Sequence, residues 1–174
     1  MPTLAQPSLL ERYPPGSVTP EEGLEQPTLR VTPDVLPELA LHLRDSPDTQ
    51  FDLLLDLCGV DYPEREERFE AVYHLYSIPR GERLRLKVGV RADDATLPSL
   101  VSVWKAADWF EREAFDMFGL RFDGHPNLRR ILTHEAFQGH PLRKDYDSAR
   151  RWVLSEEDVY KPDLTQGVEE AEDD

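Results

Sequence analysis

The sequence contains a single cysteine, Cys58, among its 174 residues. One thiol forms no disulfide within the chain, and it cannot by itself hold an iron–sulfur cluster or a cysteine-rich zinc site. No apolar stretch approaches the roughly 18–20 residues that cross a bilayer. The opening stretch MPTLAQPSLLERYPPG has neither a basic region nor a continuous apolar segment, so we expect no signal peptide. These absences predict a soluble cytoplasmic protein.

Positive charge is also scarce, since the net charge is −15. Free nucleic acid is therefore excluded as an expected partner, because its phosphates require basic patches. The exception is the stretch 121–152, which is locally basic between two acidic ones. Such a stretch is typical of a surface that meets a partner, and equally of one that neutralises the protein's own acids.

Motifs that carry catalysis are missing as well. There is no GxGxxG or GxxxxGK[ST] motif for a nucleotide, and Ser99, Ser102 and Ser148 lie outside any GxSxG elbow. Cys58 lies in a predicted strand, where we expect a buried, small apolar residue and not a reactive thiol. The residues alone thus favour an interaction protein over an enzyme.

The chain divides into three parts by composition. Residues 1–27 are rich in proline and predict a flexible arm, and residues 153–174 form an acidic tail. The domain between them, 28–152, ends in a turn-rich segment, 120–152, which we call the strap. Gly124 and Gly139 lie in its turns, and we expect aromatic residues to pin it to the domain: Phe122, Phe137 and Tyr146.

We expect strands at 28–31, 51–58, 69–78 and 83–90; apolar residues alternate in all but the first, and a short turn at 79–82 joins the last two. In the second of these strands, alternation places one set of residues on the core face: Phe51, Leu53, Leu55 and Leu57. Leu36, Leu39, Ala40 and Leu43 follow the spacing of a helix that begins near Thr32, its expected N-cap, and ends near Asp45.

Two further helices are predicted after the strands. Leu97, Leu100, Val101 and Trp104 share one helical face, with Thr96 near its start. Asp108 and Glu111 match a capping box at the start of the last helix, and Gly119 suits its left-handed end. We therefore predict a two-layer α+β fold, in which helices cover one face of a small, mostly antiparallel or mixed sheet and the extended strap follows.

Two groups of side chains could bind a metal ion. Glu113 and Asp116 are three residues apart on the last helix, so they share a face and could act as ligands or as an acid–base pair. His125, His134 and His140 lie close together in the strap. The alternatives are structural: acids favour the first turn of a helix, and histidines before proline hold turns by bonding a carbonyl or carboxylate. A stand-alone metallohydrolase would use these five residues.

The run EREAFDMFGLRFDGHPNLRRILT, followed by GHPLRKDY, resembles the C subunit of respiratory NADH:quinone oxidoreductase, complex I, which lies in its hydrophilic arm. The signature residues are Glu111, Arg112, Glu113, Phe115, Asp116, Met117, Phe118, Gly119, Gly124, His125, Pro126, Asn127, Leu128, Arg129, Arg130, Ile131 and Leu132. Upstream, DLCGVDYP and FEAVYHLYSI are similar to the sheet of that family. The resemblance covers roughly residues 28–147 and departs from the family at Leu120 and Asp147.

The resemblance implies a structural and assembly subunit in the hydrophilic arm of a proton-translocating enzyme. Such a subunit is peripheral, on the cytoplasmic side of a bacterial inner membrane, and contacts the large quinone-site subunit and cluster-bearing subunits. It carries no cofactor and no catalytic residue, while partner subunits hold FMN, iron–sulfur clusters, NADH and quinone. Related hydrogenase and ferredoxin-linked complexes carry equivalent subunits, so they remain an alternative.

We further expect the last helix and the strap to form a docking surface. Phe115, Phe118 and Phe122 would anchor the strap to the core. Five charged residues would reach a neighbouring subunit: Arg129, Arg130, Arg143, Lys144 and Asp145. Arginine suits this role because its planar fork forms paired hydrogen bonds with carboxylates. On this hypothesis, Arg130→Ala weakens assembly more than it unfolds the domain.

Overall fold

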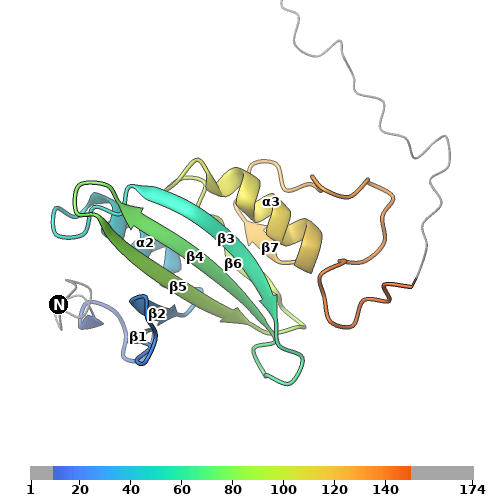
Figure 1. Ribbon diagram of the computed structural model, residues 1–174, viewed down its shortest axis with the longest axis horizontal. Helices are drawn as coiled ribbons and strands as arrows, with labels where there is room; N and C mark the ends of the chain where they lie inside the picture. Colours follow the sequence, from blue (N-terminus) through green and yellow to red (C-terminus); the bar gives the residue numbers. More distant parts are fainter. Residues whose placement is uncertain (1–9, 150–174) are drawn as a thin grey trace, which may run out of the picture.

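A computed structural model of the chain describes residues 10–149. Its main sheet has the strand order β1-β2-β5-β4-β3 (Figure 1). The strands are β1 Val18–Pro20, β2 Thr28–Val31, β3 Leu53–Asp61, β4 Phe69–Ser77 and β5 Glu82–Val90. All neighbours pair antiparallel except β2 and β5, which are parallel. The sheet is therefore mixed and mostly antiparallel, as predicted.

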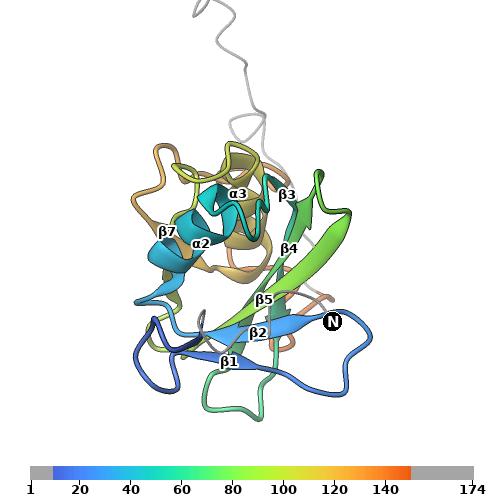
Figure 2. The same cartoon turned by 90° about the vertical axis from the view of Figure 1, so that its left-hand side faces the viewer.

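Two helices, α2 (Leu36–Asp45) and α3 (Ala107–Phe118), lie on the same side of this sheet (Figure 2). Alternate residues of β4 and β5 are fully buried beneath them, among them Tyr73, Leu84 and Leu86. This arrangement confirms the predicted α+β class with helices on one face. Within the described range, neither helix is long and apolar enough to cross a membrane.

The predicted faces of the strand at 51–58 are wrong at three leucines, although Phe51 and Leu57 are buried as expected. The pairing of β3 with β4 shifts between Leu54 and Asp56, so Leu55 is an extra, bulged residue. A bulge interrupts the alternation of side chains, and Leu54 is consequently buried while Leu53 and Leu55 are exposed. A pattern of consecutive leucines could not reveal which of them would bulge.

The helix predicted from Thr96 to Trp104 is also wrong. Residues Thr96–Pro98 form strand β6, which pairs in parallel with β7, Arg121–Asp123, at the start of the strap. Only a hydrogen-bonded turn follows, in which the Trp104 amide donates to the Leu100 carbonyl at 2.8 Å. Leu97, Leu100 and Trp104 are buried as expected, but strand pairing with a distant segment overrides their helical spacing.

Both predicted helix starts differ from the structure. The N-cap of α2 is Val35 and not Thr32, and the N-cap of α3 is Ala106, with no capping side chain at either. The predicted ends are correct: α2 ends at Asp45, and Gly119 closes α3 with a φ of 74°. The capping box of Asp108 and Glu111 therefore does not form.

The structure also differs from the flexible arm expected over residues 1–27, of which residues 1–9 lie outside the described range. Val18 pairs with Val31 at the edge of the sheet, and both Val18 and Tyr13 are buried in the core. The apolar residues of this arm are too widely spaced to show a period, so their burial could not be read from the pattern. The acidic tail expected at 153–174 lies outside the described residues.

Candidate docking surface along helix α3 and the strap

The strap is attached to helix α3 through the carboxylate of Asp116, which is fully buried. One oxygen accepts hydrogen bonds from three consecutive amides, those of Ile131, Leu132 and Thr133, at 2.8–3.1 Å. The other accepts from the Thr133 hydroxyl and from the Arg130 guanidinium, the latter at 2.7 Å. Successive amides converging on one anion form a nest, so Asp116 fixes the backbone of the strap.

The charge of Asp116 is stabilised by these donors. Burial by itself would raise the pKa of this carboxyl, but the hydrogen bonds from Thr133, Leu132 and Arg130 outweigh it and lower the pKa below its ordinary value. Arg130 also donates to the Gly139 carbonyl at 2.9 Å. Its side chain, predicted to reach a neighbouring subunit, thus binds within its own chain, and its removal would leave a buried carboxylate without its cation.

A second attachment lies at the end of β3. The buried carboxylate of Asp61 accepts hydrogen bonds from two guanidinium nitrogens of Arg68, at 2.8 and 2.9 Å, and from the Lys144 amide at 2.8 Å. The hydrogen bond from Arg68 is the main reason that the pKa of Asp61 is lowered. Arg68 also pairs with Asp145 at 2.9 Å. Asp145 therefore has a partner inside the chain, and the segment 144–145 is tied to the sheet.

Arg143 lies between these two attachments. Its Nε donates to the Phe118 carbonyl at 2.5 Å, and its guanidinium lies 4.7 Å from the centre of the Phe69 ring. The Leu142 amide donates to the Met117 carbonyl at 3.1 Å. Polar groups of the strap thus satisfy the last carbonyls of α3, which have no partner within the helix.

The two histidines that precede proline have the predicted structural role, which is to bond a backbone carbonyl. His125 Nε2 lies 3.1 Å from the Asp108 carbonyl, and His140 Nδ1 lies 3.0 Å from the Asp116 carbonyl. His134 instead packs edge-on against Phe137. Within residues 10–149, no potential metal-binding group includes any of these histidines. Glu113 is exposed, whereas the carboxylate of Asp116 binds the strap, so the residues of the alternative function, a metallohydrolase, are not brought together.

The aromatic anchors contribute unequally. Phe122 is 2% exposed and belongs to the core, and Phe118 packs against that core from its edge. Phe115 is half-buried and meets His140 edge-on, with ring centres 6.2 Å apart. Tyr146 stacks on Phe137 within the strap. The strap is therefore held by both buried polar groups and aromatic contacts.

Glu111 has a role that the sequence did not indicate. Its fully buried carboxylate accepts hydrogen bonds from the Ser99 hydroxyl and the Leu100 amide, at 2.7 and 2.6 Å. Burial raises the pKa of Glu111 to about 7, because these two bonds offset only part of the cost of removing the charge from water. Glu111 thus joins α3 to the segment after β6.

We predict that Glu111→Gln flattens the pH dependence of stability. The folded state holds the proton of Glu111 more tightly than the unfolded chain does. This contribution is complete below the ordinary pKa of 4.5 and is lost as the pH rises toward 7. Gln keeps both hydrogen bonds without a charge. Between pH 4.5 and pH 8 the free energy of unfolding of the variant should therefore rise by up to about 3 kcal/mol relative to that of wild type. Urea unfolding at both pH values measures the difference.

Glu113→Gln provides the matched control, because Glu113 is an exposed acid on the same helix. As the pH rises from 4.5 to 8, Glu111→Gln should change relative to wild type by more than Glu113→Gln does. If Glu111→Gln behaved in the same way, burial of an ionisable carboxyl at this position would be the wrong explanation.

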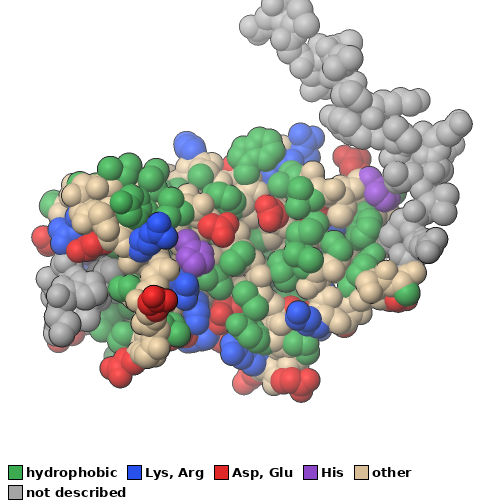
Figure 3. Space-filling model, viewed as in Figure 1, with side chains coloured by type: hydrophobic (Ala, Val, Ile, Leu, Met, Phe, Trp, Pro, Cys, Tyr) green, Lys and Arg blue, Asp and Glu red, His purple; other side chains and the backbone are tan. Residues whose placement is uncertain are grey.

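Large apolar side chains lie on the outer side of this region. Trp109, Leu132 and Leu142 are 62%, 62% and 52% exposed. All three lie on or next to α3. Trp109 belongs to this helix, and the backbone amides of Leu132 and Leu142 donate hydrogen bonds to Asp116 and Met117 of it. Figure 3 shows hydrophobic side chains gathered over α3 and the adjoining strap. We call these three residues, with the exposed Arg129 and Lys144, the docking surface.

We call the opposite face of the sheet, which neither helix covers, the open face. Cys58 is exposed on it, so its predicted burial is wrong. The physical reason is that both helices cover only the other face, on which Leu54 and Leu57 are buried. Sequence reasoning also missed that Asp56 and His74 lie beside Cys58.

Comparison with known proteins agrees with this description. Residues 29–151 match the family model described as the respiratory-chain NADH dehydrogenase, 30 Kd subunit. The NADH-quinone oxidoreductase C subunit of Azorhizobium caulinodans is 47% identical over 133 residues, which cover 76% of this chain and 63% of that protein, just under two thirds of its length. The C/D subunit of Bdellovibrio bacteriovorus is 52% identical over 120 residues, covering 69% of this chain and 21% of that protein.

A solved structure supports the same assignment. The trypsin-resistant fragment (1–134) of Nqo5 superposes with a TM-score of 0.58 and 33% identity, covering 64% of this chain and 89% of the fragment. The fold, the sequence match and the signature residues around α3 therefore agree. This chain belongs to the family of the 30 kDa subunit of respiratory-chain NADH dehydrogenase.

Proposed function

We propose that this chain is a structural and assembly subunit in the peripheral arm of a proton-translocating NADH:quinone oxidoreductase. In this role it docks the large quinone-site subunit and cluster-bearing subunits, and it supports electron transfer from NADH to quinone without carrying a redox centre. FMN, the iron–sulfur clusters and the quinone site belong to those partners. The chain lies on the cytoplasmic side of the bacterial inner membrane and reaches the membrane only through the complex.

The observation that carries this proposal is the inverted polarity of the strap. Its polar groups point inward, onto Asp116 and Asp61, while the side chains of Leu132 and Leu142 are exposed. An isolated domain gains nothing from exposing large apolar side chains on a segment that it holds rigidly. A partner that covers these side chains buries their apolar area. The strap loses little conformational entropy on binding, because the chain already holds its backbone.

The quinone-site subunit is the partner that we assign to the docking surface. The Bdellovibrio relative is named as a C/D subunit, and this chain matches 21% of its length, so the remainder is a second part of the same polypeptide. Two subunits that occur as one polypeptide lie within reach of each other. Arg129 and Lys144 would meet carboxylates of this partner at the polar rim of the interface.

We expect Leu132→Asp to reduce assembly by about thirtyfold or more. A charge at the centre of an apolar contact is desolvated without a partner, and interface anchors of this kind contribute about 2 kcal/mol or more. The measurement is a mild-detergent pull-down of the tagged chain from native membranes, which scores co-purified subunits and NADH:quinone oxidoreductase activity. Urea unfolding of the variant should match that of wild type, since Leu132 is exposed.

Leu41→Asp is the control, because Leu41 is 42% exposed on α2, away from the strap. It should assemble normally. Equal recovery of the complex with Leu132→Asp and with wild type, at matched expression, would remove Leu132 from the interface. If wild-type chain recovered no oxidoreductase subunits, the proposed function itself would be wrong.

A further inference from the structure

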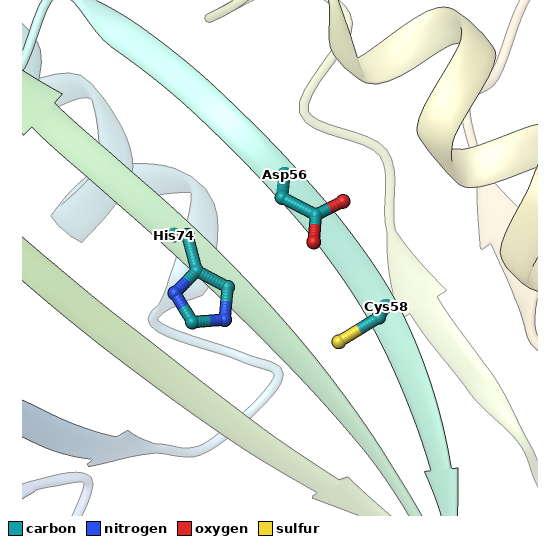
Figure 4. A group of neighbouring side chains, drawn as sticks. All are labelled: Asp56, Cys58 and His74. Atoms are coloured by element: carbon teal, nitrogen blue, oxygen red, sulfur yellow. The ribbon is translucent and has the colours of Figure 1, made fainter.

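Three potential metal ligands meet on the open face of the sheet. Asp56 and Cys58 lie on β3, and His74 lies on the adjacent strand β4 (Figure 4). A carboxylate oxygen, the sulfur and a ring nitrogen all lie within 4.8 Å of one another. Within residues 10–149 this is the one group of at least three such side chains that converges in this way.

Strand pairing explains why these side chains meet. Asp56 is directly opposite His74, and Cys58 is opposite Val72, which makes Cys58 the diagonal neighbour of His74 on the same face. The bulge at Leu55 precedes Asp56 and turns Leu54 into the core. The convergence therefore depends on backbone register and not on one adjustable surface rotamer.

The combination of donors selects a type of ion. A thiolate, an imidazole and a carboxylate are the ligands of zinc, which binds them in tetrahedral geometry and leaves a fourth position for water or an external ligand. We propose that Asp56, Cys58 and His74 form a zinc-binding site that links β3 to β4 beside the bulge. On binding, the Cys58 thiol releases its proton to the solvent and the sulfur forms the bond to zinc. Zinc changes no oxidation state, so the site is not an electron carrier.

The surrounding charges allow this. Arg85 pairs with His74 from β5, on the side away from β3, and a lone cation there would oppose a metal ion. Bound thiolate and carboxylate carry two negative charges, which neutralise Zn²⁺, so Arg85 faces no net positive charge.

The test uses the full chain, freed of metal with a chelator and titrated with Co²⁺, which is then displaced by Zn²⁺. We expect one ion per chain and an absorption band from thiolate-to-cobalt charge transfer. Cys58→Ser should abolish this band, and Cys58→Ser, Asp56→Asn and His74→Gln should each weaken zinc binding by about tenfold or more, because losing a ligand costs at least as much as losing its supporting hydrogen bond. Circular dichroism confirms that each variant is folded.

The control is His42→Gln, since His42 is a surface histidine on α2 outside the group. Its zinc affinity should equal that of wild type. A second measurement needs no variant: Zn²⁺ should protect Cys58 from alkylation in the wild-type chain. Zinc that bound Cys58→Ser as tightly as wild type, or that left the alkylation rate unchanged, would overturn the proposal. Neither result bears on docking, which is measured by assembly.

Discussion

Asp116→Asn should release the strap from helix α3. The carboxylate accepts from three consecutive amides, the Thr133 hydroxyl and Arg130, and it is fully buried. Asn keeps one oxygen that accepts hydrogen bonds. Its other group, an NH2, cannot accept the hydrogen bonds that the second carboxylate oxygen accepts in wild type. Breaking a buried pair from one side costs about 3–5 kcal/mol. The expected readout is cleavage of the folded chain by trypsin at Arg129 or Arg130, faster by about a hundredfold or more.

The same variant should assemble poorly, because Leu132 is positioned by the amides that Asp116 holds. Glu113→Gln is the control: it removes an acid from the same helix, three residues away, where the side chain is exposed. Its trypsin cleavage and assembly should match those of wild type. A strap that resisted trypsin equally in Asp116→Asn and in wild type would mean that its aromatic contacts alone hold it.

Gly119→Ala should destabilise the chain for two separable reasons. The φ of 74° lies in the left-handed region, which costs a residue with a Cβ about 1–2 kcal/mol. A Cβ at this position would also lie 2.6 Å from Nε2 of His140 and closer still to the guanidinium of Arg143. Neither side chain moves freely, because His140 bonds the Asp116 carbonyl and Arg143 bonds the Phe118 carbonyl. Urea unfolding and trypsin cleavage of the strap measure the outcome.

Gly124→Ala separates the two effects. Gly124 has a similar φ of 82°, but a Cβ there would meet nothing within 4 Å. Only the backbone cost applies to it, so Gly119→Ala should be more destabilising by at least about 1 kcal/mol and should alone accelerate cleavage of the strap. Equal effects of the two substitutions would show that close contact between Gly119 and the strap is unimportant.

Local patterns were sufficient where structure is local. The alternation at 69–78 and 83–90 predicted β4 and β5, and the apolar spacing before Asp45 predicted α2. Gly119 was recognised because few other residues tolerate its backbone conformation. The histidines before proline were correctly interpreted as holding backbone carbonyls. In each case neighbouring residues decide the outcome, so the sequence contains the information.

Tertiary pairing decided the segments that local spacing misassigned. Leu97, Leu100 and Trp104 have helical spacing, yet the parallel pairing with Arg121–Asp123 makes Thr96–Pro98 a strand. Likewise, Leu55 becomes the bulged residue only because β3 must match β4 on both sides of it. Glu111, expected at a helix cap, instead bonds Ser99 and Leu100 on the preceding segment.

The amino-acid sequence by itself determined the family and the α+β class, because these rest on residue identities and short-range periodicity. Only the tertiary structure decided which charges of the strap turn inward. Arg130, Arg143 and Asp145 find partners within the chain, while Leu132 and Leu142 are exposed. It also brought Asp56, Cys58 and His74 together. The physical reason is the same for both: each depends on contacts between segments far apart in the chain, and residue identity does not specify those distances.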